Sequence, residues 1–97
     1  MSEQKLRIAH LHLQQADIFR QQSQLEPCIA EFSKAIDIYK EMVETEPAVW
    51  FMIADTLESI GATYKAAGEL GKASETFGEA IALRSKLASV SAEKDPE

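Results

Sequence analysis

The sequence contains one cysteine, Cys28, so an intrachain disulfide bond is excluded. A single cysteine fits a reducing compartment better than an oxidising one. Glycine and proline are also scarce, with 4 and 3 residues among 97. Together with an apolar content of 45%, this scarcity excludes a disordered chain and predicts one small domain with a packed core.

Long apolar runs are missing as well. The longest, Ala48 to Ala54, is far too short to cross a bilayer. Residues Met1 to Arg7 are polar and charged, and no apolar run follows them, so we expect that this segment is not a signal peptide. We therefore expect a cytoplasmic protein that does not bind a membrane.

Basic residues are too few for a nucleic-acid binder. Ten Lys and Arg face sixteen Asp and Glu, which gives a net charge of −6, and a phosphate backbone is bound by clustered positive charge. There is no glycine-rich phosphate loop, nucleophile elbow or activated Ser or Cys arrangement. The sequence therefore predicts neither nucleic-acid binding nor enzymatic activity, and no cofactor.

Two histidines and the cysteine are the only candidates for a metal site. His10 and His12 lie two residues apart, so on a helix they point to different sides, and no carboxylate–histidine motif accompanies them. We interpret them as histidines at semi-buried helix positions and Cys28 as a small packing residue. No metal site is predicted.

What the sequence does contain is helical periodicity. Apolar residues recur three and four apart in four segments: about 3–22, about 27–44, a third that starts near Pro47 and ends before Gly68, and a fourth that runs to Val90. Pro27 and Pro47 each suit the first position of a helix, and Gly68 suits a left-handed C-cap. Short loops make neighbouring helices antiparallel. We predict an all-α domain over residues 1–90, built as two stacked antiparallel helical hairpins, and a disordered C-terminal tail over 91–97.

An internal repeat supports this architecture. Phe32 to Ile38 reads FSKAIDI, and Phe77 to Leu83, 45 positions later, reads FGEAIAL. Phe, Ala, Ile and an aliphatic residue recur at the same offsets, which is typical of a repeat protein.

These residues resemble the tetratricopeptide repeat (TPR) family. The second half matches the family pattern at Leu57, Ile60, Gly61, Tyr64, Ala73, Phe77 and Ala80; the first half matches at Ala16, Phe19, Cys28, Phe32 and Ala35, with His12 and Gln15 as departures at large apolar positions. The small residues suit close helix approach, and the aromatic residues fill the space beside them. The resemblance covers about residues 9–87 and implies a TPR-like α-α superhelix with about two repeats.

The repeat length departs from the family. The usual period is about 34 residues, whereas this one is 45, and Lys40 and Ser85 stand where the family has a terminal proline. We therefore predict that the second helix continues through Met42 and Val43 and that both partners are longer by about a turn and a half. In this the chain is similar to long-helix variants such as kinesin light chains and some bacterial peptide-sensing regulators.

The resemblance implies a peptide-binding groove lined by the first helix of each repeat. By position, its lining residues are His10, Leu13, Asp17, Arg20, Asp55, Glu58, Ala62 and Lys65. A Lys and Asn clamp for a C-terminal carboxylate is missing, because Leu13 and Asp17 hold its positions. The acidic side chains favour a basic or mixed segment as ligand. The alternative is that these charges only solvate an exposed face.

Apolar residues outside the groove supply further candidate contacts. Trp50 and Phe51 are adjacent and so about 100° apart around a helix, which leaves Phe51 as an exposed anchor for a partner, unless the hairpin core covers both. Leu87 and Val90 are further anchors, because no capping helix follows them. Since two repeats are fewer than such arrays usually need, we predict a homodimer or obligate docking on another protein. The alternative is a self-contained four-helix domain.

The function we expect is protein–protein interaction, as an adaptor, scaffold or co-chaperone-like module that binds a peptide or helix in the groove. The alternative is a small regulatory protein that senses a signalling peptide or modulates a partner enzyme.

Overall fold

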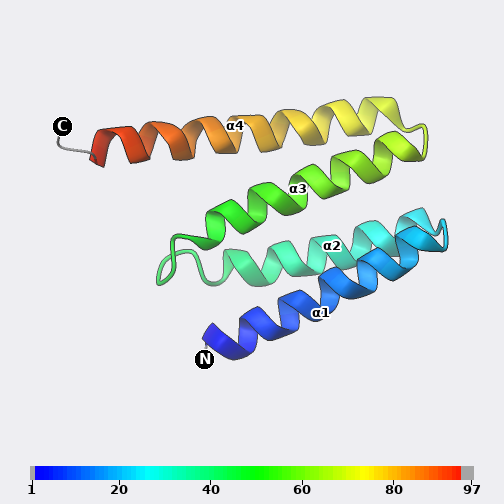
Figure 1. Cartoon of the computed structure of the whole chain (residues 1–97), viewed down its shortest axis with the longest axis horizontal. Coiled ribbons are helices and arrows are strands. Elements are labelled where there is room, and N and C mark those ends of the chain that lie inside the picture. The colour runs from blue at the N-terminus through cyan, green and yellow to red at the C-terminus, as the bar shows by residue number, and fades with distance from the viewer. Residues whose placement is uncertain (1, 95–97) are drawn as a thin grey trace.

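The computed structural model describes residues 2–94, and it is all-α, as the periodicity predicts. The helices are α1 (Ser2–Gln21), α2 (Leu25–Lys40), α3 (Val49–Ala66) and α4 (Leu70–Lys94). They form two antiparallel hairpins, α1 with α2 and α3 with α4, which stack through α2 and α3 (Figure 1). Among the described helices, none combines the length and apolar content that a membrane span requires.

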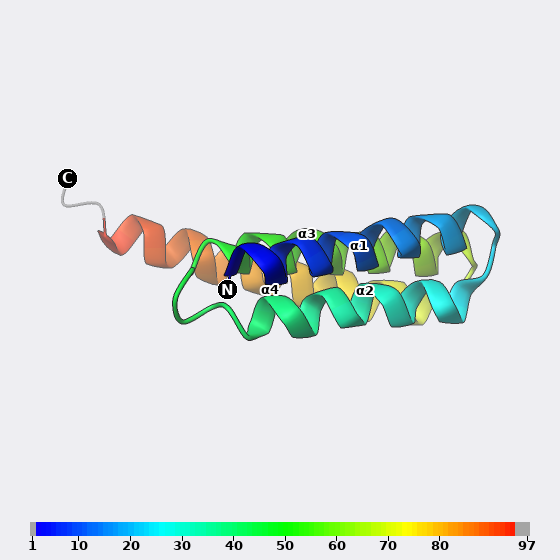
Figure 2. The same cartoon turned by 90° about the horizontal axis from the view of Figure 1, so that it is seen from below.

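The four helices lie in two layers. Seen along the stack, α1 and α3 form one layer while α2 and α4 form the other (Figure 2). The extensive contacts in the described part of the chain are those between consecutive helices, α1 with α2, α2 with α3 and α3 with α4. α1 and α3 thus share one layer without extensive contacts between them.

The turn of the second hairpin is built around Gly68, as predicted. Gly68 has a φ of +82°, in the left-handed region that glycine adopts at low cost. Its N–H donates to the carbonyl of Lys65 at 3.0 Å, and the N–H of Glu69 donates to that of Tyr64 at 2.9 Å. This pair of bonds is a Schellman motif, which satisfies the last carbonyls of α3 and turns the chain into α4.

The first hairpin turns in the same way with a different residue. Ser23 has a φ of +59°, and it lies 45 positions before Gly68. Its N–H donates to Arg20 at 3.0 Å, and that of Gln24 donates to Phe19 at 2.9 Å. The two repeats therefore share one turn geometry, but the first holds it with a side chain that the left-handed region disfavours.

The prediction that α2 continues through Met42 and Val43 is wrong. The helix ends at Lys40, where the family's proline would stand, and residues 41–48 form an eight-residue connection. The N–H of Met42 donates to Tyr39 at 2.9 Å, in a tight turn that directs the Met42 side chain into the core, where it is 2% exposed. Pro47 also disfavours a helical Glu46. Much of the extra length of the repeat is therefore in this connection.

Both proline assignments are off by two residues. Pro27 is the third residue of α2, still in the first turn, where its missing N–H has no intrahelical partner. Pro47 precedes α3 by two residues, in a turn whose i→i+3 bonds lead into the helix. At the other end, α4 continues to Lys94, past the predicted start of the tail at Ser91. The part of that tail at 95–97 lies outside the described residues.

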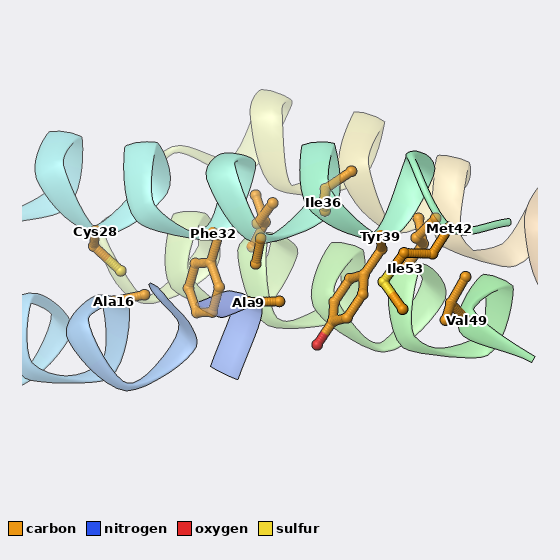
Figure 3. Packing of buried hydrophobic residues seen from close by; sticks show 11 residues of the cluster. Ala9, Ala16, Cys28, Phe32, Ile36, Tyr39, Met42, Val49 and Ile53 are labelled. Carbon is orange, nitrogen blue, oxygen red and sulfur yellow. The ribbon is translucent and has the colours of Figure 1, made fainter. Parts of the chain in front are cut away.

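The core lies between the layers and is centred on α2 (Figure 3). Ala9 and Ala16 of α1 are fully buried, as are Cys28 and Ala35 of α2. At the end near the connection, Tyr39 and Met42 pack with Val49 and Ile53, as Figure 3 shows. Met42 reaches this cluster from the turn after α2.

Small residues allow the second hairpin to close. Gly61 is buried, and a Cβ atom built on it would lie 3.0 Å from two ring carbons of Phe77. Ala73 and Ala80 are 4% and 1% exposed. The prediction that these three positions permit close helix approach is confirmed.

Candidate functional site

The main candidate site is a groove between α1 and α3. A cavity of about 280 Å³ opens there, and its lining residues are Leu13, Asp17 and Arg20 of α1, Phe32 of α2, and Asp55, Thr56, Ser59 and Ala62 of α3. A second cavity of about 250 Å³ adjoins it at Arg20 and runs toward the two hairpin turns, where Ser23 and Ala67 lie. We call these two cavities, which share Arg20 as a lining residue, the α1–α3 groove.

The floor of the α1–α3 groove is apolar. Phe32 reaches it from α2 and is 7% exposed, and Leu13 lies half-buried beside it. Thr56 is 4% exposed, and its hydroxyl donates to the carbonyl of Met52 at 2.8 Å, so it presents no unpaired polar group. Such a floor suits an apolar side chain of a ligand, with polar groups at the rim to orient it.

On the α1 side, the rim carries an ion pair within one helix. Arg20 donates a hydrogen bond to Asp17, and the amide of Gln21 donates to the other carboxylate oxygen at 2.9 Å. The Arg20 hydrogen bond is the main cause that lowers the pKa of the Asp17 carboxyl. The Asp17 carboxylate thus already accepts from two side chains of its own helix.

On the α3 side, the rim is tied to α4 by one arginine. Arg84 donates from Nε to Glu58 at 2.5 Å and from its terminal nitrogen to Asp55. The Glu58 bond and then the Asp55 bond raise the pKa of the Arg84 guanidinium. Although it is paired, the Asp55 side chain is 70% exposed, so its carboxylate can accept a further donor from solvent or a ligand.

Five of the eight residues predicted for the groove come together in the main cavity: Leu13, Asp17, Arg20, Asp55 and Ala62. The other three do not line it. His10 and Lys65 are exposed on α1 and α3, and Glu58 bonds to Arg84 of α4.

Sequence reasoning missed three lining residues of the main cavity, Phe32, Thr56 and Ser59, and it also missed Arg84, the partner of Asp55. Ser59 lies four residues after Asp55 and three before Ala62 on α3, so helical spacing contained the signal for it. Phe32 was assigned to packing through its repeat counterpart Phe77, and nothing in the sequence indicates that it also reaches the groove. Arg84 occupies the repeat position of Tyr39, which is a core residue, so the repeat pattern itself concealed it.

The predicted apolar anchors lie away from the groove. Phe51 is 47% exposed at the start of α3, in agreement with the exposure predicted for it, while Trp50 beside it is half-buried. Val90 is 43% exposed and Leu87 half-buried on the last turns of α4.

A second cleft lies on the opposite layer, between α2 and α4. It has a volume of about 300 Å³, and its lining residues are Ile29, Ser33, Ile36, Asp37 and Lys40 of α2, Leu57, Ile60 and Tyr64 of α3, and Thr76 and Glu79 of α4. The α2 residues that line this cleft mark the side of α2 that faces the second hairpin.

The histidines and the cysteine are not brought together. His12 is half-buried, as predicted, and its Nδ1 lies 2.6 Å from an oxygen of Glu31 on α2. The same prediction is wrong for His10, which is exposed. Cys28 is fully buried, in agreement with its predicted packing role, and burial raises the pKa of its thiol. Among the described residues, no three His, Cys, Asp or Glu side chains are grouped so as to hold a metal ion.

Compared with protein-family models, with curated proteins and with solved structures, the chain matches none of them. What the coordinates show is a four-helix, all-α protein made of paired helical hairpins, with an open groove between its first and third helices.

Proposed function

We propose that the chain is a pair of TPR-like repeats that binds an extended peptide in the α1–α3 groove. The observation that carries the proposal is the convergence of Leu13, Asp17, Arg20, Asp55 and Ala62 on one cavity. The TPR resemblance selected these positions for peptide binding from the sequence alone. The rigid hairpins hold them on helices rather than on loops, which favours a preformed site.

The chemistry of the groove favours a mixed segment with at least one basic residue. Phe32 and Leu13 offer contact to one apolar side chain of the ligand. At the rim, the carboxylates of Asp17 and Asp55 are paired with the guanidinium groups of Arg20 and Arg84 respectively, and the chain as a whole has a net charge of −6. A Lys or Arg of the peptide would therefore be attracted, most directly to the exposed carboxylate of Asp55.

The test uses a phage-displayed library of random peptides selected on the wild-type chain, with affinities measured by fluorescence anisotropy on synthetic copies. Ala62→Trp places a large ring in the groove from an exposed position, and it should weaken binding by about tenfold or more, which corresponds to about 1.4 kcal/mol. Ala30→Trp, on an exposed position of α2 outside the groove, is the matched control and should bind as wild type.

Two results would overturn the proposal. One is a set of selected peptides that bind Ala62→Trp as tightly as wild type. The other is the absence of any peptide that distinguishes wild type from this variant. Asp55→Asn adds a test of the ligand's charge: it should weaken basic peptides more than neutral ones, and the difference should shrink as salt rises.

A further inference from the structure

The two outer edges of the stack expose apolar side chains that the interior of the same stack buries. On α1 the outer edge consists of Ile8, Leu11, Gln15 and Ile18, all of them exposed. A shift of 45 residues maps these onto Ile53, Thr56, Ile60 and Thr63 of α3, which are 2–6% exposed in the described structure. The outer edge of α1 is thus the surface that α3 uses to pack on the first hairpin.

The outer edge of α4 can be compared in the same way with α2, its counterpart in the first repeat. It consists of Leu70, Ser74, Gly78, Ile81 and Ser85, all exposed and none charged. The same shift maps them onto Leu25, Ile29, Ser33, Ile36 and Lys40 of α2, four of which line the cleft that faces the second hairpin. Ile36 is 8% exposed there, whereas Ile81 is 65% exposed.

The composition of the α1 edge strengthens the comparison. At two positions the exposed edge is more apolar than its buried counterpart: Leu11 corresponds to Thr56, and Ile18 corresponds to Thr63. Leu11 is 58% exposed and Ile18 is 47% exposed. Exposure of Leu11 and Ile18 to water is unfavourable, and the equivalent positions on α3 are buried even though they hold threonine. We therefore expect another surface to cover this edge.

One chain cannot cover its own edges, because α1 and α4 lie at opposite ends of the stack (Figure 1). We propose that a second copy of this chain docks head to tail, with its α1 outer edge on the α4 outer edge of the first, in the register in which α3 packs on α2. The intrachain α2–α3 interface supplies the template, and both of its halves are present, unpaired, on every copy. Such a contact is heterologous, so it leaves one free edge at each end and can propagate.

Directional docking makes a sharp prediction with two charged variants. Leu11→Glu disables only the α1 edge, and Ile81→Glu only the α4 edge. Because both residues are more than half exposed, neither change should disturb the fold, which circular dichroism and thermal unfolding would check. Ala30→Glu is the matched control, since Ala30 is exposed on α2 and its repeat counterpart is Glu75.

The measurement is sedimentation equilibrium over rising protein concentration, because association must first offset lost translational and rotational freedom. Wild type and Ala30→Glu should show an average mass that rises past two chains. Each edge variant alone should stay at the 10.8 kDa of one chain. An equimolar mixture of Leu11→Glu and Ile81→Glu should form a dimer and stop there, because one intact edge of each kind remains.

Three outcomes would overturn the proposal. A wild-type chain that stays monomeric at every concentration would show that the edges need no second copy. A Leu11→Glu variant that still dimerises would indicate a symmetric contact between two α4 edges. A mixture that fails to dimerise after both single variants have lost association would exclude the head-to-tail register. None of these outcomes depends on peptide binding, because the edge residues do not line the α1–α3 groove.

Discussion

Replacing Gly61 by alanine tests the close approach of α3 and α4 most directly. The added Cβ would lie 3.0 Å from two carbons of the Phe77 ring, so the ring or the helix must move by a few tenths of an ångström. Overpacking of this kind costs about 1–3 kcal/mol. Alanine also favours the helix over glycine by about 1 kcal/mol, which gives a net destabilisation of about 0–2 kcal/mol.

The matched control is Gly78→Ala on α4. Gly78 also lies inside a helix, but a Cβ built on it meets nothing within 4 Å. Only the helix preference remains there, so this variant should be about 1 kcal/mol more stable than wild type. The difference between the two variants, about 1–3 kcal/mol, measures the contact with Phe77 alone.

Urea and thermal unfolding followed by circular dichroism would measure both changes, at a protein concentration low enough to keep the chain monomeric. For a domain of this size, 1 kcal/mol shifts the melting temperature by about 4–8 °C. If Gly61→Ala were stabilised as much as Gly78→Ala, the close approach would be refuted. Phe77→Leu should relieve the crowding, so the double variant Gly61→Ala/Phe77→Leu should be more stable than the sum of the single changes predicts.

Three further predictions concern the turns, the hydrogen bond between His12 of α1 and Glu31 of α2, and the thiol. Ser23→Gly should stabilise the chain by about 1 kcal/mol, because Ser23 has a φ of +59°, and Gly68→Ala should destabilise it by a similar amount; chemical unfolding measures both. The hydrogen bond to His12 lowers the pKa of Glu31 from 4.5, so the pair contributes stability above that pH and loses it as the pH falls through the lowered value. Acid unfolding of Glu31→Gln should therefore show a weaker pH dependence. Cys28 is fully buried with a raised pKa, so a thiol reagent should label it only as fast as the protein opens, and mild denaturant should speed the labelling.

The helices and their pairing follow from the sequence because the signals are periodic and local. The repeated FSKAIDI and FGEAIAL segments place Phe and Ala at equal offsets. Phe32 and Ala35 belong to the core cluster shared with α1, and Phe77 lies against Gly61 of α3. The turn at Gly68 can be predicted from the residue type, because glycine adopts the left-handed conformation at low cost. Ser23 does not, and only the 45-residue offset to Gly68 identifies it.

Other features depend on contacts that no short segment contains. α2 ends at Lys40, and Met42 is buried from the turn that follows. The apolar periodicity continues through Met42 and Val43, so it does not mark this helix end. For the groove, repeat positions brought out five lining residues. The partner of Asp55 could not be predicted from the sequence, because Arg84 stands at a position where the first repeat has a core tyrosine.

The restriction of extensive contacts to consecutive helices has a kinetic and a mechanical consequence. Each helix meets chiefly its sequence neighbours, so native contacts join residues that are near in the chain, and loops close at little entropic cost. Such a topology should fold within milliseconds. The two hairpins are also joined mainly through the interface between α2 and α3. A slight rotation of one hairpin against the other at this interface would widen or narrow the α1–α3 groove without changing either hairpin.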